Sequence, residues 1–208
     1  MYIFLIIAKI IEGSRNHLSS WFWNKWAYAY LVNHKAQIPH SSKIMFYGHT
    51  LLRIEPKAKV IIGENFICRS DPQNAIDNCC CTKIYVGSGA TLYIGFNSGI
   101  SNCVINCQTE IRIGNYVNIG AGTALIDSNF HSTNWKDRED RSLDSMNSKK
   151  SSIVIEDYAF IGMRCSILKG VHVGSKAIVA AGSVVVCDIP ENEIWGGNPA
   201  KFIKKLNK

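Results

Sequence analysis

Aliphatic side chains recur at every sixth position over the C-terminal half of the chain. From residue 155 onward six of them follow one another at this spacing without a break: Ile155, Ile161, Ile167, Val173, Val179 and Val185. An earlier run, Ile113, Ile119 and Leu125, has the same period. Small or apolar residues fill the fifth position of each unit, as at Ala159 and Ala177. The pattern predicts a repeating unit of six residues.

A period of six matches neither an α-helix nor a half-buried strand, whose side chains repeat every 3.6 and 2 residues. We expect instead an all-β solenoid of triangular section, in which each unit supplies one short strand and one corner. Three units make one coil of about 18 residues, with the aliphatic side chain pointing inward. Stacked coils would bury one continuous core, and each coil would depend on its neighbours.

Three parts of the chain are distinguished by composition. Residues 1–43 are apolar and aromatic, residues 44–190 carry the repeats, and residues 191–208 form a short C-terminal extension. Lys9 interrupts the first apolar run, which is shorter than the roughly 20 residues of a spanning helix. We expect helices or irregular structure there, packed on the main domain or on a partner subunit. Peripheral association with a membrane is the alternative.

An insert at residues 132–152 breaks the repeat. The stretch "STNWKDREDRSLDSMNSKKSS" has nine charged residues among 21, too polar to form a coil. A long loop inside a compact repeat is often functional. We therefore expect a protruding loop that contributes to a site.

Charge and cysteine content narrow the possible partners. The net charge is +7, but no run of five Lys or Arg occurs, so no nucleic-acid partner is expected. The eight cysteines form no CxxC pair, and no secretory signal with a cleavage site is apparent. This favours free or buried thiols in a reducing cytoplasm.

Three stretches resemble the hexapeptide-repeat acyltransferases, in the branch that acetylates maltose, galactosides and polysaccharides. They are "IRIGNYVNIGAGTALIDSNFHS", "IEDYAFIGMRCSILKGVHVGSKAIVAAGSVVVCDIP" and "NEIWGGNPAKFIKKL", within about residues 84–205. The resemblance implies a left-handed parallel β-helix, acetyl-CoA as cosubstrate, and a homotrimer with sites between subunits. It also implies that the insert walls the site of a neighbouring subunit.

The resemblance assigns a catalytic role to His131 at the mouth of the insert. Histidine suits a general base for a hydroxyl because its pKa lies near neutral pH. Asp127, four residues earlier, is predicted to orient the ring or contact the acceptor. Asn102 is predicted to orient the acceptor or the oxyanion, with Ser101 and Asn106 as alternatives.

Coenzyme A contacts are implied for a second group of residues. The thioester arm is expected along the small residues of "AAGS" and beside an aromatic side chain, and the 3′-phosphate near two lysines. The residues are Phe160, Gly162, Ala180, Ala181, Gly182, Ser183, Lys201 and Lys204. Val186-Cys187 departs from the Thr-Lys that relatives often carry there.

We predict an acetyl-CoA-dependent O-acetyltransferase that acts on a sugar hydroxyl in surface-polysaccharide synthesis, such as O-antigen, capsule or exopolysaccharide. We expect it in the cytoplasm, or at the inner face of the membrane. Alternatives are another small acceptor (a free sugar, serine, an antibiotic or an amino-sugar nucleotide) and a catalytically silent scaffold. A zinc enzyme of the γ-carbonic anhydrase type needs three histidines, and the stretch of resemblance, about residues 84–205, offers only His131 and His172, so no metal is expected.

Overall fold

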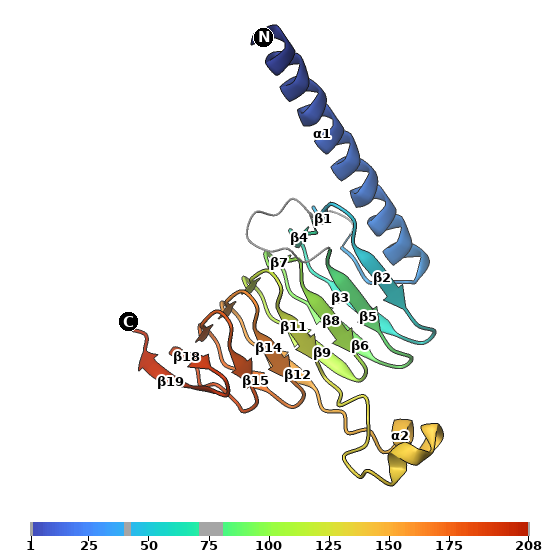
Figure 1. Cartoon of the computed structure of the whole chain (residues 1–208), viewed down its shortest axis with the longest axis vertical. Helices are drawn as coiled ribbons and strands as arrows, with labels where there is room; N and C mark the ends of the chain where they lie inside the picture. The colour runs from blue at the N-terminus through green and yellow to red at the C-terminus, as the bar shows by residue number, and fades with distance from the viewer. Residues whose placement is uncertain (1, 40–42, 71–80, 208) are drawn as a thin grey trace.

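Three parallel β-sheets, visited in turn by the chain, form the body of the protein (Figure 1). The structure is a computed structural model that describes residues 2–39, 43–70 and 81–207, with side chains in the first helix from Leu18 onward. Through the repeat region, each strand pairs in parallel with the strand three places earlier and the strand three places later in the chain. Each coil therefore adds one strand to each sheet, an arrangement that fits a left-handed parallel β-helix.

The eight-stranded sheet consists of β1 (Met45–Tyr47), β4 (Ile67–Arg69), β7 (Gly99–Ser101), β10 (Asn118–Ile119), β13 (Phe160–Ile161), β16 (Ile178–Val179), β18 (Glu193–Gly197) and β19 (Ala200–Lys205). The six-stranded sheet consists of β2 (Leu51–Ile54), β5 (Lys83–Val86), β8 (Val104–Cys107), β11 (Ala124–Ile126), β14 (Ser166–Leu168) and β17 (Val184–Val185). The five-stranded sheet consists of β3 (Lys59–Ile62), β6 (Thr91–Ile94), β9 (Glu110–Ile113), β12 (Ile153–Ile155) and β15 (His172–Val173).

The aliphatic positions of the repeat form the core. Ile155, Ile161, Ile167, Val173, Val179 and Val185 are each at most 1% exposed, as the six-residue period predicts. The small residues at the fifth positions, such as Ala159 and Ala177, are also buried and fill the prism beside the corners. Because every coil buries its aliphatic side chains against the next, the core is continuous along the solenoid.

Close stacking of coils explains why one corner position is glycine. A Cβ atom at Gly162 would lie 2.6 Å from the backbone nitrogen of Ala181 on the next coil. Gly182, in contrast, has φ +74° with open space around its Cβ position, so it is glycine for its backbone conformation.

The N-terminal segment is a single helix, α1 (Tyr2–Asn33), whose second half covers the first coils. Ala27 and Leu31 are buried in the core cluster. The Asn24 side-chain oxygen accepts a hydrogen bond of 2.8 Å from the Phe46 N–H on β1. Such a cover protects the end of a solenoid from solvent. Within the described part of the chain, no helix has the length and apolarity needed to cross a membrane.

The insert and the C-terminal residues extend from opposite parts of the prism (Figure 1). Between β11 and β12 the insert contains a short 3-10 helix, η1 (Asp137–Glu139), and a helix, α2 (Arg141–Met146), which projects away from the sheets. After β17, strands β18 and β19 form an antiparallel pair that ends the eight-stranded sheet.

Candidate functional site

His131 forms a carboxylate–histidine pair with Asp144. Its Nδ1 lies 2.6 Å from the Oδ2 of Asp144, and the histidine side chain is 69% exposed, against 14% for the aspartate. A carboxylate only accepts hydrogen bonds, so this contact places the proton on Nδ1. Nε2 of the neutral ring then keeps a lone pair that faces away from the aspartate. A histidine whose tautomer is fixed in this way has the chemistry that a general base needs.

A hydrogen-bond network within the insert holds this pair. The N-cap residue Asp140 starts α2 by accepting hydrogen bonds from the backbone of Ser142 and Leu143, which brings Asp144 back toward the start of the insert. The Ser132 N–H donates to Asp144 Oδ1 at 2.7 Å, and its hydroxyl donates to Asp137 Oδ2 at 2.7 Å.

Both carboxyls of this network favour the ionised form. The hydrogen bond with His131 lowers the pKa of Asp144, and the backbone N–H of Ser132 lowers it further. The pKa of Asp137 is lowered by the hydroxyl of Ser132 and the amide of Asn147. An ionised Asp144 is the state that stabilises an imidazolium at His131.

Asp127 does not make the predicted hydrogen bond to His131. It is buried at the base of the insert, where its carboxylate accepts hydrogen bonds from the backbone N–H groups of Gln108, Thr109 and Glu110 at 2.7, 2.7 and 3.0 Å. Burial raises its pKa, against the effect of these hydrogen bonds. Asp127 therefore fixes the insert to the preceding coil. Sequence reasoning selected the nearer aspartate and missed Asp144, although Asp140 was a signal for a helix start that places Asp144 on its first turns.

The predicted Asn102 lies on the corner between the eight-stranded and six-stranded sheets. It is buried with φ +41°, and its backbone carbonyl accepts a hydrogen bond from the Gly122 N–H of the next coil. On the next two coils the same corner is formed by Arg164 and Gly182. The Gly182 N–H donates a hydrogen bond to the Met163 carbonyl of the coil before it. The "AAGS" turn thus belongs to the same corner as Asn102, two coils beyond Gly122.

Within that turn, small residues leave the backbone open. Ala181 and Gly182 are exposed, as close approach of a thioester arm would require. Ser183 is buried, its hydroxyl donates to the Ala180 carbonyl, and it accepts from the Gly197 N–H at 3.1 Å. The Ser183 side chain is therefore occupied with joining the turn to β18, and is not available to a cofactor.

Phe160, Lys201 and Lys204 lie on the eight-stranded sheet beside this corner. Phe160 is exposed and in register with Ile178, which is in register with Ile194 and then Lys204. The aromatic ring and one lysine thus share a row across the sheet. Lys201 is exposed two strands away from the turn, on β19.

One chain does not bring the two groups of predicted residues together. Asp127 lies five positions after Gly122, at the other end of a strand of the six-stranded sheet, and the turn lies two coils further. Strand geometry places the base of the insert roughly 15–20 Å from the turn. The insert then projects away from the prism (Figure 1). Acyl transfer needs reacting atoms about 3–3.5 Å apart.

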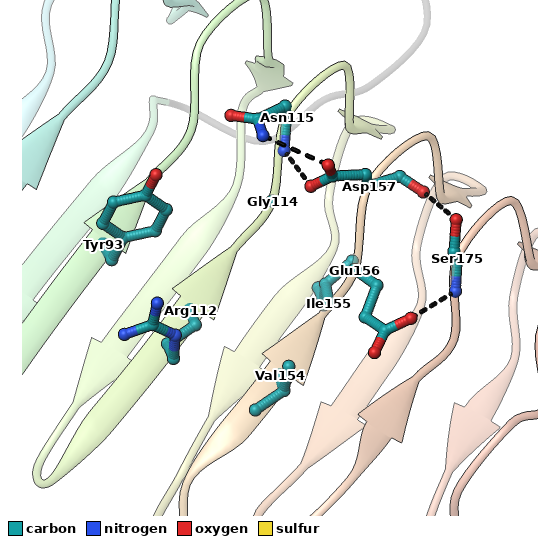
Figure 2. A pocket seen from close by; sticks show the side chains of 9 residues that line it. All are labelled: Tyr93, Arg112, Gly114, Asn115, Val154, Ile155, Glu156, Asp157 and Ser175. Carbon is teal, nitrogen blue, oxygen red and sulfur yellow. Dashed lines mark hydrogen bonds between the residues drawn. The ribbon is translucent and has the colours of Figure 1, made fainter.

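A hollow of about 420 Å³ on the five-stranded sheet contains none of the predicted residues (Figure 2). Its Arg112 lies over the Tyr93 ring and pairs with Glu110, and its other polar groups are bonded to one another. The Asn115 amide donates to Asp157 at 3.1 Å, and Glu156 accepts from the Ser175 N–H at 2.9 Å. These contacts join successive coils, so the groups serve the corner of the prism.

His172 does not join His131. Its Nε2 lies 2.8 Å from Glu156 on the five-stranded sheet. No group of three or more His, Cys, Asp or Glu side chains with metal-binding geometry occurs in residues 2–39, 43–70 and 81–207. Among the cysteines described, Cys187 is exposed and Cys68, Cys81, Cys103, Cys107 and Cys165 are buried free thiols. Cys79 and Cys80 lie outside the described residues.

Parts of the chain are similar to several known proteins. The model of the "hexapeptide repeat of succinyl-transferase" matches residues 152–187. Gamma carbonic anhydrase 2 of Arabidopsis thaliana is 34% identical over 59% of this chain and 44% of its own length. An N-acetyltransferase of tetrahydropyridine dicarboxylate from Clostridium perfringens is 46% identical over 28% of this chain and 25% of its own. The chain spans about half, or less, of these curated relatives.

Two solved structures share the fold over most of the chain. A hexapeptide-repeat acetyltransferase of Vibrio cholerae, complexed with acetyl coenzyme A, is 24% identical with a TM-score of 0.50, and covers 94% of this chain and 87% of its own. An N-acyltransferase of Bacillus cereus, in complex with an amino-sugar dTDP nucleotide and coenzyme A, is 14% identical with a TM-score of 0.67. It covers 88% of this chain and 90% of its own.

Proposed function

The repeat model and the shared fold support a hexapeptide-repeat acetyltransferase, and from that premise we propose that the protein transfers acetyl from acetyl-CoA to a sugar hydroxyl in surface-polysaccharide synthesis. The observation that carries the proposal is the His131–Asp144 pair, whose 2.6 Å contact uses Nδ1 and leaves the lone pair of Nε2 facing away from the aspartate. An alcohol is a weak nucleophile at neutral pH, so a positioned base is the group this reaction needs.

The reaction balances with the residues of the pair. Nε2 of His131 takes the hydroxyl proton while the hydroxyl oxygen attacks the thioester carbonyl. Asp144 stabilises the imidazolium that forms. When the intermediate collapses, the C–S bond breaks and the imidazolium returns its proton to the coenzyme A thiolate. The products are an acetyl ester and free coenzyme A.

A closed trimer would bring the two groups of residues together. If the insert of each copy meets the "AAGS" corner of the next, the six-stranded sheet of every copy faces the threefold axis. From β8 to β17, most outward positions of that sheet suit packing at an axis because they are small or apolar and only partly exposed. They include Val104, Ala124, Ile126, Ser166, Leu168 and Val184.

Mixed trimers test this arrangement. His131→Ala removes the base, and Ala181→Trp fills the exposed turn on the other side of the cleft. If each site takes its base and its turn from different copies, equal mixing of the two inactive variants restores about one quarter of the sites. Sites contained within one chain would stay inactive in every mixture. Light scattering verifies that the mixtures are trimers.

The acceptor is tested by free-thiol release from acetyl-CoA with a panel of sugars, serine and amino sugars. We expect turnover with sugar hydroxyls. An amine acceptor is the second candidate, because the Bacillus cereus structure holds an amino-sugar nucleotide. Preference for that amine over every hydroxyl acceptor would replace O-acetylation by N-acetylation. Association of the N-terminus with the inner membrane face remains a proposal, and sedimentation with anionic vesicles tests it.

A further inference from the structure

A second hollow, of about 280 Å³, lies on the outer face of the eight-stranded sheet. Ile67 and Phe160 form its apolar walls, and Gly99 forms its floor. Three polar side chains complete the lining: Arg69, Ser101 and Asn118. Of these residues, only Phe160 and Ser101 have a role predicted from the sequence, Ser101 as an alternative to Asn102.

The pairing of the strands explains the hollow. Ile67, Gly99, Asn118 and Phe160 stand in one row across β4, β7, β10 and β13. Gly99 leaves the row open between exposed Ile67 and exposed Phe160, since the nearest atoms to its Cβ position are 3.6 and 3.8 Å away. The space therefore has apolar walls and Gly99 at its floor, with the amide of Asn118 beside that glycine.

Arg69 contributes a positive charge that has no carboxylate partner among the described residues. Three arginines of the prism lie over tyrosine rings, one on each sheet: Arg53 over Tyr85, Arg69 over Tyr47 and Arg112 over Tyr93. Two of them also form ion pairs, Arg53 with Glu55 at 2.7 Å and Arg112 with Glu110 at 3.4 Å. Arg69, held 5.1 Å above the Tyr47 ring, is the one directed to a hollow without such a pair.

The hollow adjoins the expected position of the thioester. Its wall Phe160 is also the aromatic side chain predicted beside the arm of coenzyme A. Gly120, at its edge, is followed on the next coils of the same corner by Gly162 and Ala181. The hollow is therefore about two coil spacings, or roughly 10 Å, from the "AAGS" turn at Gly120, but only one strand spacing from the strand before that turn at Phe160, so the end of a ligand at Phe160 is the part that would reach the donor.

We propose that this hollow binds the acceptor and that Arg69 selects acceptors carrying an anionic group next to the reacting sugar. The substrate class is then an anionic sugar, either a glycosyl phosphate, including a nucleotide-linked or lipid-linked one, or a uronic acid. Phe160 and Ile67 contact the ring, Asn118 and Ser101 bond its hydroxyls, and the guanidinium binds phosphate or carboxylate oxygens. The inference rests on the proposed acetyl transfer.

Acceptor pairs that differ only in the anionic group test the proposal. The kcat/KM of the trimer is measured by free-thiol release for a neutral sugar, its 1-phosphate, its nucleotide diphosphate and its uronic acid. Wild-type protein should have a higher kcat/KM for at least one anionic acceptor than for the neutral sugar. The acceptor with the highest kcat/KM then shows whether the anionic group is a phosphate, a nucleotide diphosphate or a carboxylate. Arg69→Gln should lower the anionic-to-neutral ratio about 10- to 100-fold, the loss of one charge-assisted hydrogen bond. The control Arg112→Gln, which removes the equivalent arginine from another sheet, should leave the ratio unchanged.

The outcomes separate this inference from the proposed function. Turnover of neutral sugars with an Arg69→Gln ratio equal to wild type overturns the inference and leaves the acetyltransferase intact. Absence of turnover with every acceptor contradicts the proposed function. In that case calorimetry with the sugar 1-phosphate tests separately whether the hollow binds an anionic sugar. If Arg69→Gln weakens this binding at least tenfold and Arg112→Gln does not, the inference about the hollow is supported. If the two variants bind the sugar 1-phosphate equally well, the inference is overturned.

Discussion

Asp144→Asn is the substitution that most directly separates the chemistry of His131 from its surroundings. The structure uses both carboxylate oxygens: Oδ2 accepts from His131 at 2.6 Å and Oδ1 from the Ser132 N–H at 2.7 Å. Asparagine has one acceptor oxygen, so it can replace only one of these contacts. If its oxygen faces Ser132, its NH2 faces Nδ1, and the imidazole proton is forced onto Nε2. The ring is then unable to accept a hydroxyl proton.

The expected loss lies between two limits. Complete removal of a general base costs roughly 10²–10⁴-fold in rate. Partners that orient a histidine through its other nitrogen typically contribute about 10–100-fold. Because asparagine keeps the size of the side chain but loses its charge and one contact, we expect kcat to fall about 10- to 100-fold. KM for acetyl-CoA should change little, since Asp144 lies in the insert and not at the "AAGS" turn.

Steady-state kinetics with a turned-over acceptor measure this effect, with Glu139→Gln as the matched control. Glu139 is an exposed carboxylate of the same insert that makes no side-chain contact to His131, so its variant should retain wild-type kcat. Unchanged kcat in Asp144→Asn would refute the positioning role of Asp144. So would a fall that appears only in KM.

Three further predictions address stability and reactivity. Asp127→Asn should lower the free energy of unfolding by about 1–3 kcal/mol, measured by denaturant titration, because one amide oxygen cannot satisfy three partly buried N–H groups. Its kcat per folded trimer should be close to wild type, and a loss as large as that of Asp144→Asn would contradict this. Below pH 4 the insert should lose hydrogen-exchange protection before the strands do. A carboxyl whose pKa is lowered by folding, such as Asp144, stabilises the fold at pH values above its ordinary pKa of 3.8. This stabilisation is lost as the pH falls through the pKa of the folded state. Equal protection of the insert at pH 5 and pH 3 would contradict this. Exposed Cys187 should react rapidly with a thiol reagent at pH 7, whereas Cys68 should not, because burial raises its pKa to about 11. Cys187→Ser should therefore remove one fast-reacting thiol per chain, and Cys68→Ser should remove none.

The core and corners were predictable because they depend on local periodicity. A six-residue repeat determines which side chains face inward, and Ile155 and Val173 are buried accordingly. Small residues at the fifth positions follow from the same geometry. These features need no knowledge of distant contacts.

The histidine's partner and the acceptor hollow were not predictable in this way. Asp144 reaches His131 only because α2 folds back across 13 residues of an aperiodic insert. Proximity in sequence favoured Asp127, whose three backbone contacts depend on the register with the preceding coil. The pairing that places Arg69 beside Ser101 joins strands whose separation in the sequence exceeds the 18 residues of a regular coil, so the spacing of the repeat does not predict their register.

Acetyl-CoA turnover by wild-type and His131→Ala trimers, measured as free-thiol release against the sugar panel, tests the central claim most directly. The account predicts acceptor-dependent thiol release by the wild type and a loss of roughly 10²–10⁴-fold in kcat for His131→Ala, with the trimer intact by light scattering. Equal turnover by the two trimers would show that His131 is not the base and would contradict the proposed mechanism.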